Sequence, residues 1–386
     1  MKNLSEEILK NAAKLAQEEQ IPLIRQINSI AHPNAIRLWL WELPYQVDDK
    51  ILEIIKNPKE EYFRYAPNAW IIPLRRSVAL NYWNEYNEEN VVITIWVQEA
   101  MFIVLSILKK LWAKKILIPE IYFWIYKKIP SELWLEIETF ALDSHFKPNF
   151  ENLENKLNSF NPEIIIINSP CNPTWTIYSK EDNKKLAEIF LKNRNPIVIS
   201  DEIYNKLTFN EEFETFFNYY ENTIVVDWIS KSWASAWLRV WWIFNWNKDL
   251  SKLFIWIWTT IKSSAPTLNQ YAAMPIVNWE TKNSIDSYKE KLKINSLIVE
   301  KYLNDLWIVF NSSQWWFYMF PDVKDFVWDD SEDFCRFAAK NENWVVVIPW
   351  KAFWKPTNVR ISFASDKIEE WMKRFSTLLN EFKTKR

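Results

Sequence analysis

Apolar and polar residues follow two different spacings along this chain. From about residue 91 to 276, short runs of β-branched and other apolar residues are separated by stretches with helical spacing. The runs lie at 91–95, 115–118, 164–167, 196–199 and 223–226. Continuous apolar strands between helices are typical of a mostly parallel sheet that is buried on both faces. The pattern therefore predicts an α/β fold, with a mostly parallel sheet sandwiched by helices.

The two ends of the chain have a different pattern. Residues 5–30 have the spacing of one or two amphipathic helices, and another helix begins near Asp48. After residue 280 a long helical stretch leads to short apolar runs and a last helix ending at Lys383. This C-terminal part is expected to form a smaller α+β domain. We expect a large domain at 46–280, a small domain at 281–386, and an N-terminal segment, 1–45, that packs on the small domain.

Charge and composition exclude several classes of protein. The formal net charge is -2, so no basic field indicates binding to nucleic acid. No uncharged apolar stretch of about 18 residues predicts a membrane span, and the charged N-terminus does not resemble a signal peptide. We therefore expect a cytoplasmic protein. With only two cysteines and two histidines, neither a disulfide framework nor a metal site is predicted.

Glycine is missing from the sequence and tryptophan is in excess. The chain has 386 residues, no Gly and 26 Trp. Average usage would give roughly 27 Gly in such a chain. Tryptophan follows Asn or Pro at 246, 279, 344 and 350, where Asn-Gly and Pro-Gly turns are expected. Trp112 follows a helical stretch, in the position of a C-terminal glycine cap.

These observations suggest a gene in which UGA codons specify glycine but have been translated as tryptophan. The alternative is a protein that is truly rich in tryptophan. The DNA decides between the two, because mostly UGG codons at the 26 positions would contradict the first hypothesis.

Polar residues with distinct chemistry follow the predicted strands. Asn172 follows the run at 164–167, and Asp201 and Tyr204 follow the run at 196–199. Lys231 follows the run at 223–226, and Arg239 comes eight residues later. In open α/β sheets ligands bind at the carboxyl ends of the strands, so these side chains are expected to meet there.

This set of residue types suits a phosphorylated pyridine aldehyde. A lysine amine forms a Schiff base with an aldehyde, and a carboxylate keeps a pyridine nitrogen protonated. Asn and Tyr donate hydrogen bonds to a ring oxygen, whereas Arg and the amides at a helix N-terminus bind phosphate. The segment 94–100, a predicted strand-to-helix turn around Trp96, supplies such amides.

With tryptophan interpreted as glycine, the chain resembles the class I/II aminotransferases of the fold-type I pyridoxal-phosphate family over nearly its whole length. The matching segments lie at 38–42, 65–75, 172–176, 201–204, 230–241, 315–318, 349–354 and 359–363. Each is a weak signal alone, but their order and spacing make the resemblance specific.

The resemblance implies a role for each matching residue at the cofactor. Lys231 would hold the pyridoxal 5'-phosphate and move the proton between the reacting carbons. Asp201 would pair with the ring nitrogen, and Tyr204 and Asn172 would hold the ring oxygen. The groups expected at the phosphate are Ser230, Arg239 and the amides of Val97 and Gln98. Tyr122 would stack on the ring, with Tyr126 as the alternative.

Substrate and partner contacts are implied in the same way. Arg360 would bind the substrate α-carboxylate with its planar guanidinium. Asn172 would also face the substrate. Trp41 stands where relatives have a glycine that lets the substrate approach. In relatives the residue matching Tyr65 reaches the phosphate of the neighbouring subunit, which implies a homodimer with shared active sites.

The expected activity is ping-pong transfer of an amino group between an L-amino acid and a 2-oxoacid, with glutamate and 2-oxoglutarate as one pair. Gln98 stands where many aspartate-specific relatives carry lysine, so the preferred amino acid stays open. A β C–S lyase of the same fold is the alternative. A non-enzymatic regulator is disfavoured, because the short N-terminus leaves no room for a DNA-binding domain. With tryptophan at 96, 237 and 241 the phosphate region would be crowded, so the tryptophan form is expected neither to fold well nor to bind cofactor.

Overall fold

The structure is a computed structural model that describes most of the chain. The described residues are 4–18, 23–33, 35–37, 45–172, 174, 176–208, 213–229, 234–262, 265–310, 318–327, 329–341, 345–349 and 356–385. The statements below concern this part of the chain.

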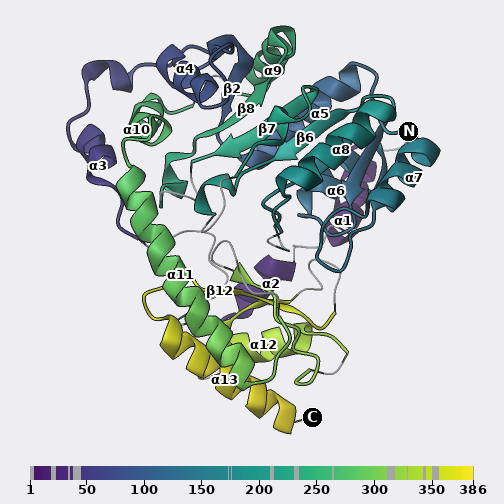
Figure 1. Ribbon diagram of the computed structural model, residues 1–386, viewed down its shortest axis with the longest axis vertical. Coiled ribbons are helices and arrows are strands. Elements are labelled where there is room, and N and C mark those ends of the chain that lie inside the picture. Colours follow the sequence, from purple (N-terminus) through teal and green to yellow (C-terminus); the bar gives the residue numbers. More distant parts are fainter. Residues whose placement is uncertain are drawn as a thin grey trace.

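A seven-stranded sheet forms the centre of the larger part of the molecule (Figure 1). Its strands, in the order β2-β8-β7-β6-β5-β3-β4, are β2 (Val91–Thr94), β3 (Lys115–Pro119), β4 (Glu136–Phe140), β5 (Ile164–Asn168), β6 (Ile197–Asp201), β7 (Thr223–Trp228) and β8 (Trp241–Asn245). Strand β8 runs antiparallel to β2 and β7, whereas the other neighbours pair in parallel. The predicted mostly parallel sheet is therefore confirmed.

Two strands were not predicted from the sequence, for different reasons. Strand β4 lies at the sheet edge, and its partly exposed Glu136 and Glu138 interrupt any apolar run. Strand β8 begins with Trp241 and Trp242. Because tryptophan was interpreted as glycine, this segment did not stand out as a strand.

Helices cover both faces of the sheet, as the apolar strands require. Ile164 and Ile166 of β5 belong to the cluster that contains α5 (Val97–Lys110), α6 (Ile125–Glu132) and α9 (Lys248–Ile261). Ile165 and Ile167 pack instead with α7 (Phe150–Phe160) and α8 (Lys180–Lys192). Successive side chains of a strand point to opposite faces, so one run of isoleucines fills both layers of the core.

The larger part of the molecule also contains short elements and three further helices. They are α3 (Asp49–Lys56), η1 (Glu60–Phe63), α4 (Ile72–Leu80), η2 (Glu88–Asn90), η3 (Asn205–Leu207), η4 (Phe216–Asn218), η5 (Ala236–Leu238) and α10 (Thr267–Val277). Helix α4 contacts both β2 and α10. The segment between η1 and α4 contains Tyr65.

The long helix α11 (Lys282–Asp305) runs from α10 to the smaller C-terminal part (Figure 1). There α13 (Ile368–Thr384) packs along α11, and α12 (Glu332–Lys340) contacts α13. An antiparallel sheet has the order β11 (Ile348–Pro349), β12 (Val359–Ser362), β9 (Tyr318–Met319). Strand β12 carries Arg360.

Part of the N-terminal region packs on this C-terminal part. Helix α2 (Leu23–Ile30) contacts α12, and β1 (Ile36–Arg37) pairs in parallel with β10 (Val345–Val346). Helix α1 (Leu4–Glu18) precedes them. These contacts join segments more than three hundred residues apart in the sequence.

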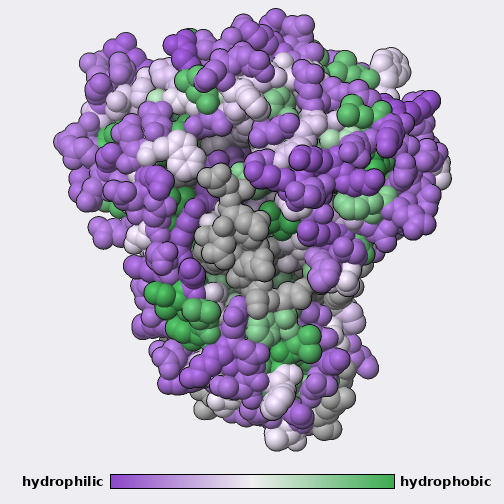
Figure 2. Space-filling view, in the orientation of Figure 1, coloured by the Kyte–Doolittle hydropathy of each residue, from purple (hydrophilic) through white to green (hydrophobic). Residues whose placement is uncertain are grey.

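Polar residues cover most of the visible face of the molecule, and its apolar side chains form separate small patches (Figure 2). Within the described residues, no helix is both long enough and apolar enough to cross a membrane.

Candidate active site

The carboxyl ends of β5 and β6 lie next to each other and present the first group of polar side chains. Asn168, the last residue of β5, pairs with Asp201, the last residue of β6. The Asn168 side chain donates to the carbonyl of Asp201 at 2.8 Å and accepts from the amide of Asn172 at 2.9 Å. Asn168 thereby fixes the turn that carries Asn172.

Asn172 connects the two parts of the molecule. Its Nδ2 donates to the Tyr204 hydroxyl at 3.3 Å, and its Oδ1 accepts from Nη1 of Arg360 at 3.4 Å. Tyr204 follows β6, whereas Arg360 comes from β12, 188 residues further along the chain than Asn172. The structure thus brings together three residues that the sequence assigned to one site.

Arg360 is buried although it carries a charge. It is 1% exposed, and its guanidinium lies over the ring of Tyr318, 4.4 Å from the centroid. Burial lowers the pKa of Arg360, and Tyr318 and Tyr204 oppose this shift. A desolvated guanidinium next to an amide and two tyrosines is suited to bind a carboxylate.

Asp201 is a buried carboxyl at the same sheet edge. Burial raises the pKa of Asp201 to about 7, while hydrogen bonds from the Tyr126 hydroxyl and the Ile203 amide act in the opposite direction. An ionised carboxylate in a buried place is stabilised by a cationic partner. A protonated pyridine nitrogen would provide one, so this end of the site fits the ring of pyridoxal phosphate.

The expected phosphate end begins at the N-terminus of α5. Val97 is the first helical residue, with Trp96 at the N-cap position and no side-chain cap. The buried Oε1 of Gln98 has no hydrogen-bond partner among the described residues. The first-turn amides of a helix and the helix dipole favour an anion at such a position.

Aromatic rings occupy the approach to these amides. The guanidinium of Arg239 lies over the rings of both Trp96 and Trp241, 3.7 Å and 4.5 Å from their centroids, and the two centroids are 5.2 Å apart. Arg239 Nη1 also donates to the Ala236 carbonyl at 2.8 Å. Arg239 is thus beside the N-terminus of α5, as expected, but the indoles of Trp96 and Trp241 do not fit a phosphate group at that place.

The remaining predicted residues divide into two groups. Tyr122, in the segment that connects β3 to α6, is buried, whereas Tyr65 is 92% exposed. Lys231, Ser230 and Trp41 lie outside the described residues, so their predicted roles stay predictions.

Asn168 and Tyr318 were not assigned a role from the sequence, and Tyr126 was named only as the alternative to Tyr122 for stacking on the ring. Asn168 orders the turn of Asn172, Tyr318 stacks on Arg360, and Tyr126 contacts Asp201. The position of Asn168 at a strand end was a usable signal. The other two contacts join distant elements, and no spacing in the sequence indicates them.

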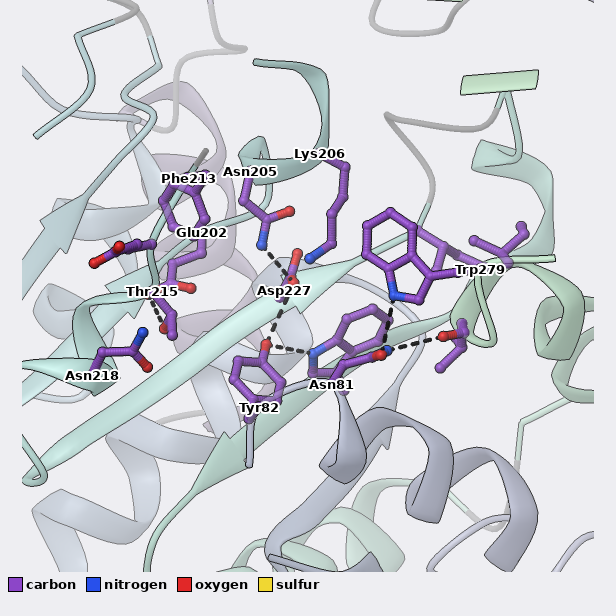
Figure 3. A pocket seen from close by; sticks show the side chains of 15 residues that line it. Asn81, Tyr82, Glu202, Asn205, Lys206, Phe213, Thr215, Asn218, Asp227 and Trp279 are labelled. Atoms are coloured by element: carbon purple, nitrogen blue, oxygen red, sulfur yellow. Dashed lines mark hydrogen bonds between the residues drawn. The ribbon is translucent and has the colours of Figure 1, made fainter. Parts of the chain in front are cut away.

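A cavity of about 180 Å³ lies beside the site and is lined by residues of several elements (Figure 3). The carboxyl of Asp227 on β7 accepts hydrogen bonds there from Asn205 at 2.8 Å and from Tyr82 at 3.4 Å. Glu202 and Ile229 also line it, next in sequence to Asp201 and Ser230. None of the predicted cofactor-binding residues in the described part of the chain lines this cavity, although it adjoins the same strand ends.

The fold and these side chains define an α/β enzyme with a buried carboxyl, an amide and an arginine at the edge of a mostly parallel sheet. Residues 42–375 match the model of the family "Aminotransferase class I and II". The chain belongs to this family, and it is a pyridoxal-phosphate-dependent aminotransferase of fold-type I.

Individual relatives agree with this assignment. The "Probable aspartate aminotransferase" of Methanocaldococcus jannaschii is 27% identical over 355 residues, which cover 89% of this chain and 92% of the relative. A double mutant of the aspartate aminotransferase of Thermus thermophilus has a TM-score of 0.85 at 18% identity, covering 94% of this chain and 98% of its own. The aromatic aminotransferase of Pyrococcus horikoshii has a TM-score of 0.82 at 23% identity, covering 93% and 99%.

Proposed function

We propose that the protein exchanges an amino group between an L-amino acid and a 2-oxoacid by a ping-pong mechanism, with glutamate and 2-oxoglutarate as one pair. The observation that carries the proposal is the bridge of Asn172 between Tyr204 and Arg360, beside the buried Asp201. A group suited to hold a ring oxygen thereby lies next to a group suited to bind a carboxylate.

When bound, pyridoxal phosphate would supply an aldehyde for the amine and a ring that accepts electrons. Asp201 would hold the proton on the ring nitrogen, and Tyr204 with Asn172 would hold the ring oxygen. Arg360 would orient the substrate by its α-carboxylate. Lys231 would carry the cofactor and then move the proton between the two reacting carbons, and Tyr122 would stack on the ring.

The phosphate would bind to Ser230, Arg239 and the amides of Val97 and Gln98, provided that the indoles of Trp96 and Trp241 are absent. We therefore propose that the functional protein has glycine at its tryptophan positions, including Trp41 near the substrate. Glycine would let backbone amides approach the phosphate closely.

The ends of four helices support this second proposal independently of the cofactor. Trp112, Trp134, Trp279 and Trp307 are the second residues after α5, α6, α10 and α11, with φ between 55° and 75°. At each end the tryptophan amide bonds three residues back, and the next amide bonds five residues back, as in a Schellman motif. Glycine is the usual residue at this left-handed position, because a side chain is disfavoured there.

The solvent exposure of these tryptophans points in the same direction. Trp112, Trp134 and Trp307 are 83%, 87% and 89% exposed, so their indoles gain little packing in return for the unfavourable φ. Eleven described residues have positive φ, and five of them are tryptophan, the fifth being Trp70. Not every predicted turn behaves this way, since Trp246 is absent from that group. Mass spectrometry of the protein from its own cell would decide between Gly and Trp.

We further propose a homodimer, a cytoplasmic location and the domain division at residues 45 and 280. Tyr65, 92% exposed in the single chain, supports the dimer because a side chain of this kind is expected to gain contacts from a partner. Exposed Phe63 and Ile72 lie on either side of it in the sequence. Sedimentation of the purified protein tests the dimer.

The relatives of the chain differ in the amino acid that their names give. Their names include aspartate and aromatic aminotransferases. The family resemblance places Gln98 where many aspartate-specific members carry lysine. The alternative is a β C–S lyase, which would use the same Lys231 and Asp201 but release pyruvate from cystathionine.

The decisive experiment is a visible absorption spectrum of the chain made with glycine at all 26 tryptophan positions, below called the glycine form. After purification with pyridoxal phosphate, the proposal expects a yellow protein that L-glutamate or L-aspartate bleaches and a 2-oxoacid restores. A folded glycine form without colour would refute it, and pyruvate release from cystathionine would favour the lyase.

A further inference from the structure

Asp201 is held by a tyrosine from another layer of the molecule. The hydroxyl of Tyr126, in α6, donates to Oδ2 of Asp201, at the end of β6, at 2.5 Å. Each residue is 1% exposed. The only other hydrogen bond given for the carboxyl in the described part of the chain comes from the amide of Ile203 to Oδ1, at 3.3 Å. The phenol is therefore the shorter and more direct donor.

The position of the phenol is fixed by packing. The ring of Tyr126 packs edge-on against Phe123, with centroids 6.4 Å apart and an interplanar angle of 87°. The hydroxyl is buried, so no solvent water would replace Asp201 as its hydrogen-bond acceptor if it turned away. Other ionisable groups that interact electrostatically with Tyr126 or Asp201 are Cys171, Tyr204 and Asp227. Tyr126, in contrast, donates a hydrogen bond directly to the carboxyl.

We propose that Tyr126 is a positioning residue that orients the Asp201 carboxylate toward the pyridine nitrogen of the cofactor and keeps it available as an anion. The inference rests on the proposed function, because it assumes that Asp201 pairs with that nitrogen. It gives Tyr126 a role through Asp201 rather than contact with the face of the ring, which is left to Tyr122.

Electrostatics supports this role. Burial raises the pKa of Asp201 to about 7, and the hydrogen bond from Tyr126 is the largest influence in the opposite direction. Without the phenol, the buried carboxylate would keep one long hydrogen bond and the unfavourable charge of Asp227. Loss of the phenol should therefore raise the pKa of Asp201 further and disfavour its ionised form.

The test replaces the donor while preserving the ring, in the full-length glycine form. Tyr126→Phe removes the hydroxyl, and 3-fluorotyrosine at the same position makes the phenol a stronger donor. The carboxyl pKa of Asp201 is followed by ¹³C NMR in the cofactor-free protein with labelled aspartate. We expect this pKa to rise in Tyr126→Phe and to fall with fluorotyrosine. The dissociation constant for pyridoxal phosphate should rise about tenfold in Tyr126→Phe, and kcat should fall by more than KM changes.

Tyr178→Phe is the matched control, because Tyr178 is also buried, at 6% exposed, and no hydrogen bond joins it to Asp201 in the described part of the chain. It should leave both the aspartate pKa and the cofactor affinity unchanged. If Tyr126→Phe behaves like this control while the parent binds cofactor, the positioning role is wrong. If the parent itself binds no cofactor, the proposed function fails instead. An NMR titration in which Phe and fluorotyrosine shift the pKa in the same direction would also overturn the inference.

Discussion

The guanidinium carbon of Arg239 lies 3.7 Å from the centroid of the Trp96 indole ring. The same guanidinium carbon lies 4.5 Å from the centroid of the Trp241 ring, which is 5.2 Å from that of Trp96 and 4.4 Å from that of Trp228. The stacking is favourable for the cation. It also directs the arginine toward indoles in the place where the family assignment expects it to meet a phosphate.

Removing the indoles of Trp96 and Trp241 should allow the phosphate of the cofactor to bind. We compare the glycine form with a form that keeps Trp96 and Trp241 but has glycine at every other tryptophan position. The glycine form should bind pyridoxal phosphate at least about tenfold more tightly, equivalent to about 1.4 kcal/mol. The change in visible absorbance on titration measures the affinity.

The control for this comparison keeps Trp256 instead. Trp256 lies in α9, is 52% exposed and stacks with Lys110, away from Arg239. It should leave the affinity unchanged. Equal affinities in all three forms would mean that Trp96 and Trp241 do not obstruct the phosphate.

The helix ends give a prediction about stability that needs no cofactor. In the chain with tryptophan at all positions, Trp112→Gly and Trp307→Gly should each raise the free energy of unfolding by about 1 kcal/mol, because φ values of 75° and 57° disfavour any side chain with a Cβ. Alanine at the same positions keeps the Cβ and should give little of this gain. Chemical denaturation measures the differences.

A matched substitution inside a helix should have the opposite effect on the free energy of unfolding. Trp371 lies within α13, where the backbone is helical and glycine costs about 1 kcal/mol relative to alanine. Trp371→Gly should therefore destabilise the protein in the same assay. A stabilising effect at Trp371, or none at Trp112 and Trp307, would contradict the assignment of the helix ends to glycine.

The sequence predicted the helices and strands whose own residues explain why they form. The isoleucines of 164–167 form a buried strand because apolar β-branched residues fill both faces, and no tertiary detail is needed to see this. Strand β4 was missed because Glu136 and Glu138 are tolerated at a sheet edge, a position that only the assembled sheet defines.

The candidate site shows the same division. Asn172, Asp201 and Tyr204 follow strands, so the edge of the sheet gathers them, and the family pattern supplied Arg360. The contact of Tyr126 with Asp201 could not be predicted, because it depends on how α6 turns against the sheet. The cavity around Asp227 was also missed, since its lining comes from segments far apart in the sequence.

Glu202 should make the cofactor-free protein less stable as the pH rises. Burial, and then the charge of Asp227, raise the pKa of Glu202 to about 8, whereas hydrogen bonds from Ser200, Thr215 and Phe216 lower it. The folded protein therefore holds this proton more tightly than the unfolded chain. The contribution to stability is complete below about pH 4.5 and is lost as the pH rises through about 8.

Glu202→Gln removes this titration and preserves the acceptor oxygen for its three donors. Urea unfolding between pH 5 and pH 9 should show a shallower loss of stability in this variant than in the parent, while Asp201 keeps its own contribution in both. Glu188→Gln, at an exposed position of α8, is the control and should follow the parent. Parallel curves for Glu202→Gln and the parent would mean that Glu202 is not the group that titrates.

Arg360 should determine how tightly the substrate carboxylate is held. In the glycine form, Arg360→Lys keeps the positive charge but loses the planar pair of donors and the stacking over Tyr318. A hydrogen bond to a charged group contributes about 1.5–3 kcal/mol, so KM for glutamate should rise by about 10- to 100-fold. Steady-state kinetics measures this change, and the absorption of the bound cofactor should stay as in the parent. Tyr318→Phe keeps the aromatic ring below the guanidinium and should shift KM far less, whereas an unchanged KM in Arg360→Lys would show that another group binds the carboxylate.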